Sequence, residues 1–156
     1  MNPLINKICS RSLDFFVCES ALYNDPRSGD ADLAGMGIIS LDLTSKNFTD
    51  TSSFIKVLND STSDSDMKKV LRYCSVAYNN GLDAIDKATD SLNSKDYENF
   101  NEIAVVAPAE AVQCERAFVR SPIKSPLTQR NQNAKLLGDI IVSVSILLLD
   151  QSSSIP

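Results

Sequence analysis

The fold is decided by residues 67–92, which read MKKVLRYCSVAYNNGLDAIDKATDSL. Apolar side chains recur in this stretch at steps of three and four residues, the spacing that places them on one side of an α-helix. The stripe consists of Met67, Leu71, Cys74, Tyr78, Leu82, Ile85, Ala88 and Leu92. We therefore expect one long amphipathic helix from about residue 65 to residue 92.

The same periodicity resumes after the polar turn NSKD at residues 93–96, where Ser94 is a candidate N-cap. Its stripe consists of Phe100, Ile103, Ala107, Ala111, Cys114 and Phe118. The two helices are thus expected to form an antiparallel hairpin. Pro108 lies inside the second helix and removes one backbone hydrogen bond, so we expect a kink or a break between Val105 and Pro108.

Two further helices are predicted on either side of this hairpin. Asp30 or Asp32 can cap the earlier helix. Its apolar residues are Leu33, Met36, Ile39 and Leu43, and it continues through Phe54, Ile55 and Leu58. We expect this helix to bend, because Gly35 and Gly37 weaken its start. For the last helix, Ser125 is the expected N-cap with Pro126 at the first helical position. Its stripe is Leu137, Ile141, Val144 and Leu148.

The apolar run from Ile140 to Leu149 is about half as long as a membrane span, so we expect a core helix there rather than an anchor. No alternating strand pattern extends beyond a few residues. The fold class indicated by the sequence is all-α.

Composition narrows the function. A chain of 156 residues that is 43% hydrophobic suits one domain, and a net charge of -5 with scattered basic residues makes nucleic acid an unlikely partner. The chain contains no histidine, which excludes Ser-His-Asp and Cys-His catalysis and histidine-bound metals. Its five glycines form no phosphate-binding loop. We therefore expect a non-enzyme without a cofactor.

The four cysteines are Cys9, Cys18, Cys74 and Cys114, and no two form the Cys-x-x-Cys spacing typical of zinc sites. Two disulfides or four buried thiols remain. Cys74 and Cys114 both lie on the apolar stripes, about 20 residues from the turn near residue 94, so they reach the same height in an antiparallel hairpin. A Cys74–Cys114 bond is therefore preferred, and it leaves Cys9 to pair with Cys18.

Two features of the sequence bear on the compartment, the N-terminal residues and the glycosylation sequons. Residues 1–7, MNPLINK, lack the pattern of a signal peptide, so we expect a protein that is either cytosolic or already mature. Asn47 and Asn59 stand in glycosylation sequons, which matter only in a secreted protein and add a little weight to secretion.

Several motifs, taken in order, resemble one known family. They are the Cys-x8-Cys spacing of residues 9–18, DPRS at 25–28, ADLAGMG at 31–37, SKDY at 94–97, QCERAF at 113–118 and KSPLTQRN at 124–131. Together they resemble the plant invertase and pectin methylesterase inhibitor family, and within it the invertase-inhibitor branch that includes pollen allergens. The resemblance covers almost the whole chain.

The resemblance implies a secreted, extracellular or cell-wall protein with a single inhibitor domain over residues 1–156. It implies an N-terminal helical hairpin at about residues 1–25 and an up-down-up-down four-helix bundle at about residues 30–150. The implied disulfides join the first cysteine to the second and the third to the fourth, in agreement with the positional argument.

The implied partner is a plant invertase, which the resemblance to the invertase-inhibitor branch favours, or alternatively a pectin methylesterase. Either is expected to bind one to one, and neither nucleic acid nor a membrane is expected as a partner. A structural or ligand-carrying bundle is a more remote alternative. The Pro-Lys-Phe triplet of known invertase inhibitors is replaced here by Tyr97-Glu98-Asn99, and of the acidic set of pectin methylesterase inhibitors only Asp83 matches. The candidate partner-binding residues are Lys95, Asp96, Tyr97 and Glu98 at the hairpin tip and Asp83, Gln113 and Arg116 on the flank.

Overall fold

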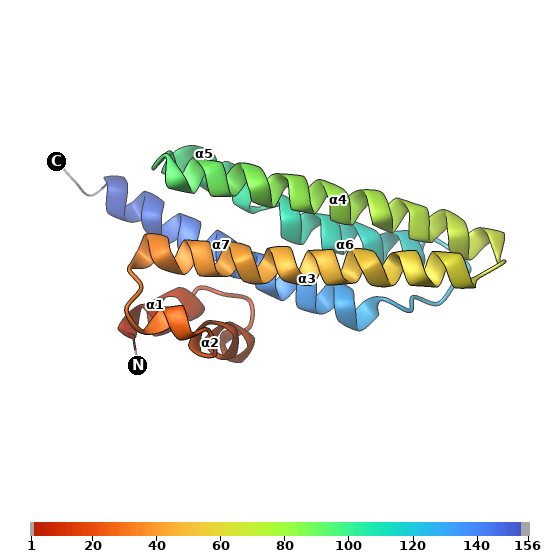
Figure 1. Ribbon diagram of the computed structural model, residues 1–156, viewed down its shortest axis with the longest axis horizontal. Coiled ribbons are helices and arrows are strands. Elements are labelled where there is room, and N and C mark those ends of the chain that lie inside the picture. The colour runs from red at the N-terminus through yellow and green to blue at the C-terminus, as the bar shows by residue number, and fades with distance from the viewer. Residues whose placement is uncertain (1, 154–156) are drawn as a thin grey trace.

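The computed structural model describes residues 2–153 and is helical throughout, with no strand in that range. The elements are α1 (Pro3–Cys9), α2 (Phe15–Tyr23), the 3-10 helix η1 (Pro26–Gly29), α3 (Leu33–Ser61), α4 (Ser65–Asn93), α5 (Tyr97–Ala104), α6 (Val106–Val119) and α7 (Thr128–Ser153). Figure 1 shows α3, α4, the α5–α6 pair and α7 side by side in alternating directions. The predicted all-α bundle is confirmed.

The central hairpin forms as the stripes predict, with one cap corrected. Asp96, not Ser94, caps α5, since its carboxylate accepts a hydrogen bond from the Asn99 amide. Ser94 is instead the last residue of the turn that closes α4, and its hydroxyl donates to the carbonyl oxygen of Asp90. Asp96 directly precedes Tyr97, the first residue of α5, whereas Ser94 lies two residues further back and closes the preceding helix.

The expected interruption near Pro108 is present. α5 ends at Ala104, α6 begins at Val106, and Val105 caps both without a side-chain hydrogen bond. Pro108 is thus the third residue of α6, in the first turn, where a missing N–H costs little. The break allows the half-buried Pro108 to pack within the bundle without kinking a continuous helix.

The start of α7 differs from the prediction. The helix begins at Thr128, two residues after Pro126. Ser125 does act as an acceptor, but for the amide of Leu127, which closes a tight turn ahead of the helix. The Leu127 side chain is fully buried, and its carbonyl accepts the first helical hydrogen bond, from Asn131. Burial of Leu127 therefore sets the point at which α7 starts.

α3 runs unbroken from Leu33 to Ser61 and is capped by Asp32, whose carboxylate accepts from the Gly35 amide. A side-chain carbon at Gly37 would lie 2.9 Å from Leu92 Cδ2 on α4. Glycine there permits close approach of the two helices, which offsets its low helix propensity.

Both predicted disulfides are present. Cys9 and Cys18 are joined between α1 and α2, and Cys74 and Cys114 between α4 and α6, with Cα–Cα distances of 5.4 and 4.7 Å. All four cysteines are buried. The core around them includes Phe48 and Tyr78, whose rings lie 4.8 Å apart.

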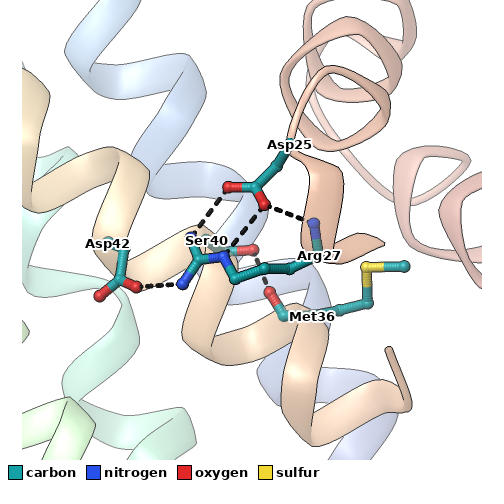
Figure 2. A network of polar contacts seen from close by, with 5 residues as sticks. All are labelled: Asp25, Arg27, Met36, Ser40 and Asp42. Atoms are coloured by element: carbon teal, nitrogen blue, oxygen red, sulfur yellow. Dashed lines mark hydrogen bonds and ion pairs between the residues drawn. The ribbon is translucent and has the colours of Figure 1, made fainter. Parts of the chain in front are cut away.

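The hairpin of α1 and α2 lies against α7 and α3 (Figure 1). Between it and α3, Arg27 of η1 forms ion pairs with Asp25 at 2.8 Å and with Asp42 of α3 at 2.7 Å (Figure 2). The guanidinium lowers the pKa of the Asp25 carboxyl through a direct hydrogen bond. Arg27 thus links the connecting segment to the first bundle helix.

By length and composition α7 could span a membrane. In this fold it is a bundle helix packed against α3, α5 and α6, and Ile140, Ile141, Val144 and Leu148 are all buried. This placement agrees with the predicted core helix.

Candidate partner-binding surfaces

The first candidate surface is the turn between α4 and α5. Two backbone hydrogen bonds close it, from the Lys95 amide to the Leu92 oxygen at 3.1 Å and from the Asp96 amide to the Ser91 oxygen at 2.9 Å. This pair of bonds defines a Schellman motif, which requires a left-handed residue and usually recruits glycine. Here the residue is Lys95, with φ of 61°, the one positive φ among non-glycine residues 2–153. Its backbone is strained, and its side chain is exposed.

The four predicted tip residues have different surroundings. The side chains of Lys95 and Glu98 are exposed and make no hydrogen bond or ion pair within residues 2–153. Asp96 is exposed but engaged as the α5 cap. Tyr97 is half-buried and packs against the hydrophobic core. Of the four predicted tip residues, the tip therefore offers a partner two free charged side chains, those of Lys95 and Glu98.

The second candidate surface is the outward face of α4 and its junction with α6. Tyr73 and Val76 are 49% and 55% exposed, although both are large apolar side chains. Asp83 follows Val76 by seven residues, or two helical turns, and so shares its face. Asp83 is exposed.

A groove of about 340 Å³ adjoins Tyr73 between α4 and α6. Val70 and Ala117 line it, and Arg120 and Pro122 close it at the end of α6. The Cys74–Cys114 disulfide joins the two helices that form its walls. We name Tyr73, Val76, Asp83 and this groove the α4–α6 face.

The structure separates the three predicted flank residues. Asp83 lies on the α4–α6 face. Gln113 is half-buried on α6, next to Cys114. Arg116 is exposed but lines a different groove, between α6 and α7. Arg116 is therefore not part of the surface that contains Asp83.

The sequence patterns did not identify Tyr73 and Arg120 as candidate partner-binding residues. Tyr73 stands next to Cys74 on the core stripe, and one residue on an α-helix is a rotation of about 100°, enough to carry its ring outside the core. That rotation was a readable signal. Arg120 could not be assigned, because its place at the groove depends on how α4 and α6 pair.

The two surfaces lie far apart. Tyr73 and Lys95 are 22 residues apart, which corresponds to about 33 Å along α4. In Figure 1 the α4–α5 turn is at one end of the bundle and the α3–α4 turn, near the groove, at the other. Substitutions on the two surfaces can therefore be tested separately.

Within residues 2–153, no three His, Cys, Asp or Glu side chains cluster closely enough to hold a metal ion. The sequons lie in α3. The side-chain oxygen of Asn47 is buried without a partner, and Asn59 is half-buried in the last turns of the helix, where its carbonyl oxygen accepts from Lys68. Glycosylation at either asparagine stays a prediction.

Comparison with known proteins gives relatives over most of the chain. A kiwifruit (Actinidia deliciosa) protein named pectinesterase inhibitor is 34% identical over 94% of this chain and 80% of its own length. An Arabidopsis thaliana protein named cell wall / vacuolar inhibitor of fructosidase 1 is 30% identical over 88% of this chain and 65% of its own length.

The fold is also similar to that of a solved structure, a mutant form of a pectin methylesterase inhibitor from Arabidopsis. The TM-score is 0.81, with 22% identity, over 92% of this chain and 95% of that one. Residues 3–144 match the model of one family, described as plant invertase/pectin methylesterase inhibitor. The chain therefore belongs to the plant invertase/pectin methylesterase inhibitor family, the proteinaceous inhibitors of plant cell-wall enzymes.

Proposed function

We propose that this protein inhibits a pectin methylesterase by placing its α4–α6 face across the active-site cleft of that enzyme. The observation that carries the proposal is the exposure of Tyr73 and Val76 beside a groove with an arginine at its end. Tyrosine and arginine are the residues most often found at energetic hot spots of protein interfaces. Exposed apolar groups gathered on one face are typical of binding sites.

The rigidity of this face favours tight binding. Because the Cys74–Cys114 bond holds α4 to α6 directly behind Tyr73, little conformational freedom remains to be lost when a partner binds. The name of the 34% identical kiwifruit relative supports the same target. We propose action by binding alone, without catalysis.

Invertase is the second candidate, and the sequence motifs favour it. Its specific support is the left-handed backbone of Lys95, because strained residues are often retained at functional sites. In this alternative Lys95 and Glu98 enter the sugar-cleaving cleft. The relative named as an inhibitor of fructosidase supports this candidate.

Inhibition assays with matched variants distinguish the two. Tyr73→Ala should weaken inhibition of pectin methylesterase at least tenfold, whereas Val57→Ala, which removes an exposed side chain from α3, should not. Lys95→Ala should leave inhibition of pectin methylesterase unchanged. If Lys95→Ala alone relieves inhibition, and the inhibited enzyme is invertase, the second candidate replaces the first. Inhibition of neither enzyme by the unmodified protein contradicts both.

We further propose an extracellular, cell-wall location and a one-to-one complex. Two disulfides favour an oxidising compartment, and a relative carries cell wall / vacuolar in its name. Size-exclusion chromatography with light scattering on the mixed proteins measures the stoichiometry. A fluorescent fusion expressed behind a secretion signal, followed after plasmolysis, measures whether the protein stays with the wall.

A further inference from the structure

The two glycosylation sequons stand at different places in α3. Residues 47–49, Asn-Phe-Thr, lie near the middle of the helix, and residues 59–61, Asn-Asp-Ser, are its last three residues. Because an N-linked glycan is bulky, the asparagine that carries it must be open to solvent in the folded protein. Neither sequon belongs to the α4–α6 face, so the inhibition proposed above does not account for them.

Asn47 lies at the edge of the buried side of α3. On a helix, the residues three before and four after a position are its neighbours along one face. For Asn47 these are Thr44 and Thr51, which are 0% and 1% exposed, and the adjoining Phe48 is fully buried. The side-chain oxygen of Asn47 is itself buried. A glycan on this amide group would therefore start at the packed edge of the bundle.

The surroundings of Asn59 are open. Lys56, three residues earlier, is exposed, and so are Asp60 and Ser61, which complete the sequon. The backbone oxygen of Asn59 accepts a hydrogen bond of 2.9 Å from Lys68 Nζ, but its side-chain amide has no partner within residues 2–153. Neither polar atom of that amide is among the buried atoms without a partner, so both are reached by solvent.

Asn59 also lines a groove between α3 and α4, which is open to solvent and has a volume of about 310 Å³. We name it the α3–α4 groove. Its other polar lining residues include Ser52, Ser53, Arg72 and Ser75. Serine hydroxyls and a guanidinium can form hydrogen bonds with the hydroxyl and acetamido groups of N-acetylglucosamine, the first sugar of an N-linked glycan. The groove therefore offers that sugar both space and polar partners.

The position of Asn59 at the end of α3 also favours modification. The enzyme that attaches the glycan must reach the sequon backbone, and the ends of a helix open at a lower free-energy cost than its middle. We propose that Asn59 carries an N-linked glycan in the secreted protein and that Asn47 carries none. This proposal rests on the extracellular location proposed above.

The glycan is expected to leave the α4–α6 face free. Arg72 lines the α3–α4 groove, whereas the next residue, Tyr73, lies on the α4–α6 face. One residue on an α-helix is a rotation of about 100°, so the groove and the face lie on different sides of α4. Glycosylation at Asn59 is therefore compatible with binding of a partner enzyme.

Secretion of the full chain from plant cells tests the assignment. Expression behind a secretion signal brings the chain into the glycosylating compartment, whatever the location of the natural protein. Release of the glycan by peptide:N-glycosidase A in heavy-oxygen water converts a glycosylated asparagine into a labelled aspartate, which peptide mapping by mass spectrometry locates. The label should appear at Asn59 and not at Asn47.

Matched variants that keep both asparagines provide the controls. Ser61→Ala removes the sequon of Asn59 and should lose the glycan, whereas Ser61→Thr keeps the sequon and should retain it. Thr49→Ala removes the sequon of Asn47 and should leave the glycan unchanged. Ser61 and Thr49 are exposed, so the fold is expected to survive, and circular dichroism verifies it. A glycan at Asn47, or an unmodified Asn59 in the secreted protein, would overturn the proposal.

An inhibition assay separates this proposal from the proposed function. The secreted protein and its glycan-free Ser61→Ala variant should inhibit pectin methylesterase equally. Weaker inhibition by the glycosylated protein would contradict the separation of the α3–α4 groove from the α4–α6 face. An absence of inhibition by both would contradict the proposed function, whereas the mass spectra decide the glycosylation site by themselves.

Discussion

The backbone amide of Leu13 donates a hydrogen bond of 2.7 Å to Oδ2 of Asp139, 126 residues later in the chain. It joins the loop between α1 and α2 to the middle of α7. Near the end of α7, Arg11 and Asp150 form an exposed ion pair of 3.5 Å. These two contacts tie the N-terminal hairpin to the bundle, and the half-buried Asp139 makes the shorter of the two.

Asp139 makes this tie sensitive to pH. Burial raises the pKa of its carboxyl, and the Leu13 hydrogen bond and the nearby Lys135 oppose this effect only in part. Because the folded state favours the protonated form, the contribution of Asp139 to stability is complete below pH of about 4 and declines as pH rises through the raised pKa. Asp139→Asn keeps an oxygen acceptor for Leu13 and does not titrate.

We therefore expect Asp139→Asn to gain stability relative to the unmodified protein between about pH 4 and pH 7, as measured by urea unfolding across that range. Asp139→Ala, which removes the acceptor, is the matched control and should lose about 1 kcal/mol. If the free energy of unfolding of the unmodified protein instead increases relative to that of Asp139→Asn as pH rises, hydrogen bonding outweighs burial and the prediction is wrong.

Gly81 is expected to tolerate no side chain. A Cβ atom there would lie 2.4 Å from Cε2 of Phe48, a fully buried ring that also packs on Tyr78. Gly81→Ala should therefore destabilise the protein by about 1–3 kcal/mol through overpacking, even though alanine is the better helix former. Gly29→Ala meets no atom within 4 Å and is the control. Thermal unfolding followed by circular dichroism compares the two variants.

Lys95 is expected to lower stability in the unmodified protein. Its left-handed conformation costs an L-residue about 1 kcal/mol that glycine avoids, so Lys95→Gly should raise the free energy of unfolding by about that amount. Lys95→Ala keeps the strained backbone conformation, so it should not raise the free energy of unfolding. Chemical denaturation of the three proteins measures the difference. Equal stabilities would show that the turn relaxes around lysine.

The two disulfides should contribute unequally. Cys74–Cys114 closes a loop of 40 residues and Cys9–Cys18 one of 9. By loop entropy, the double serine variants should lose about 4 and about 2.5 kcal/mol respectively. Urea unfolding of both variants checks the order. A larger loss for the short loop would contradict a contribution set by loop length.

Much of the fold could be predicted because it depends on local periodicity. A stripe such as Leu71, Cys74 and Tyr78 determines which side of a helix is buried. Because Cys74 and Cys114 lie on the buried sides of two adjacent helices, they can form a disulfide bond. The break before Pro108 was equally local, since proline acts on its own turn. These features follow from a few residues and from the helical repeat.

The tertiary structure decided what depends on how separate helices pair. The assignment of the α5 cap to Asp96 rather than Ser94 follows from the left-handed turn at Lys95, and the start of α7 follows from the burial of Leu127. The periodicity of α6 says that Arg116 is exposed, but only its packing against α7 says which groove it lines. The sequence by itself determined the faces of each helix, because a helix repeats every few residues. Contacts such as Leu13 with Asp139 were decided by the tertiary structure, because they join residues whose separation along the chain carries no periodic signal.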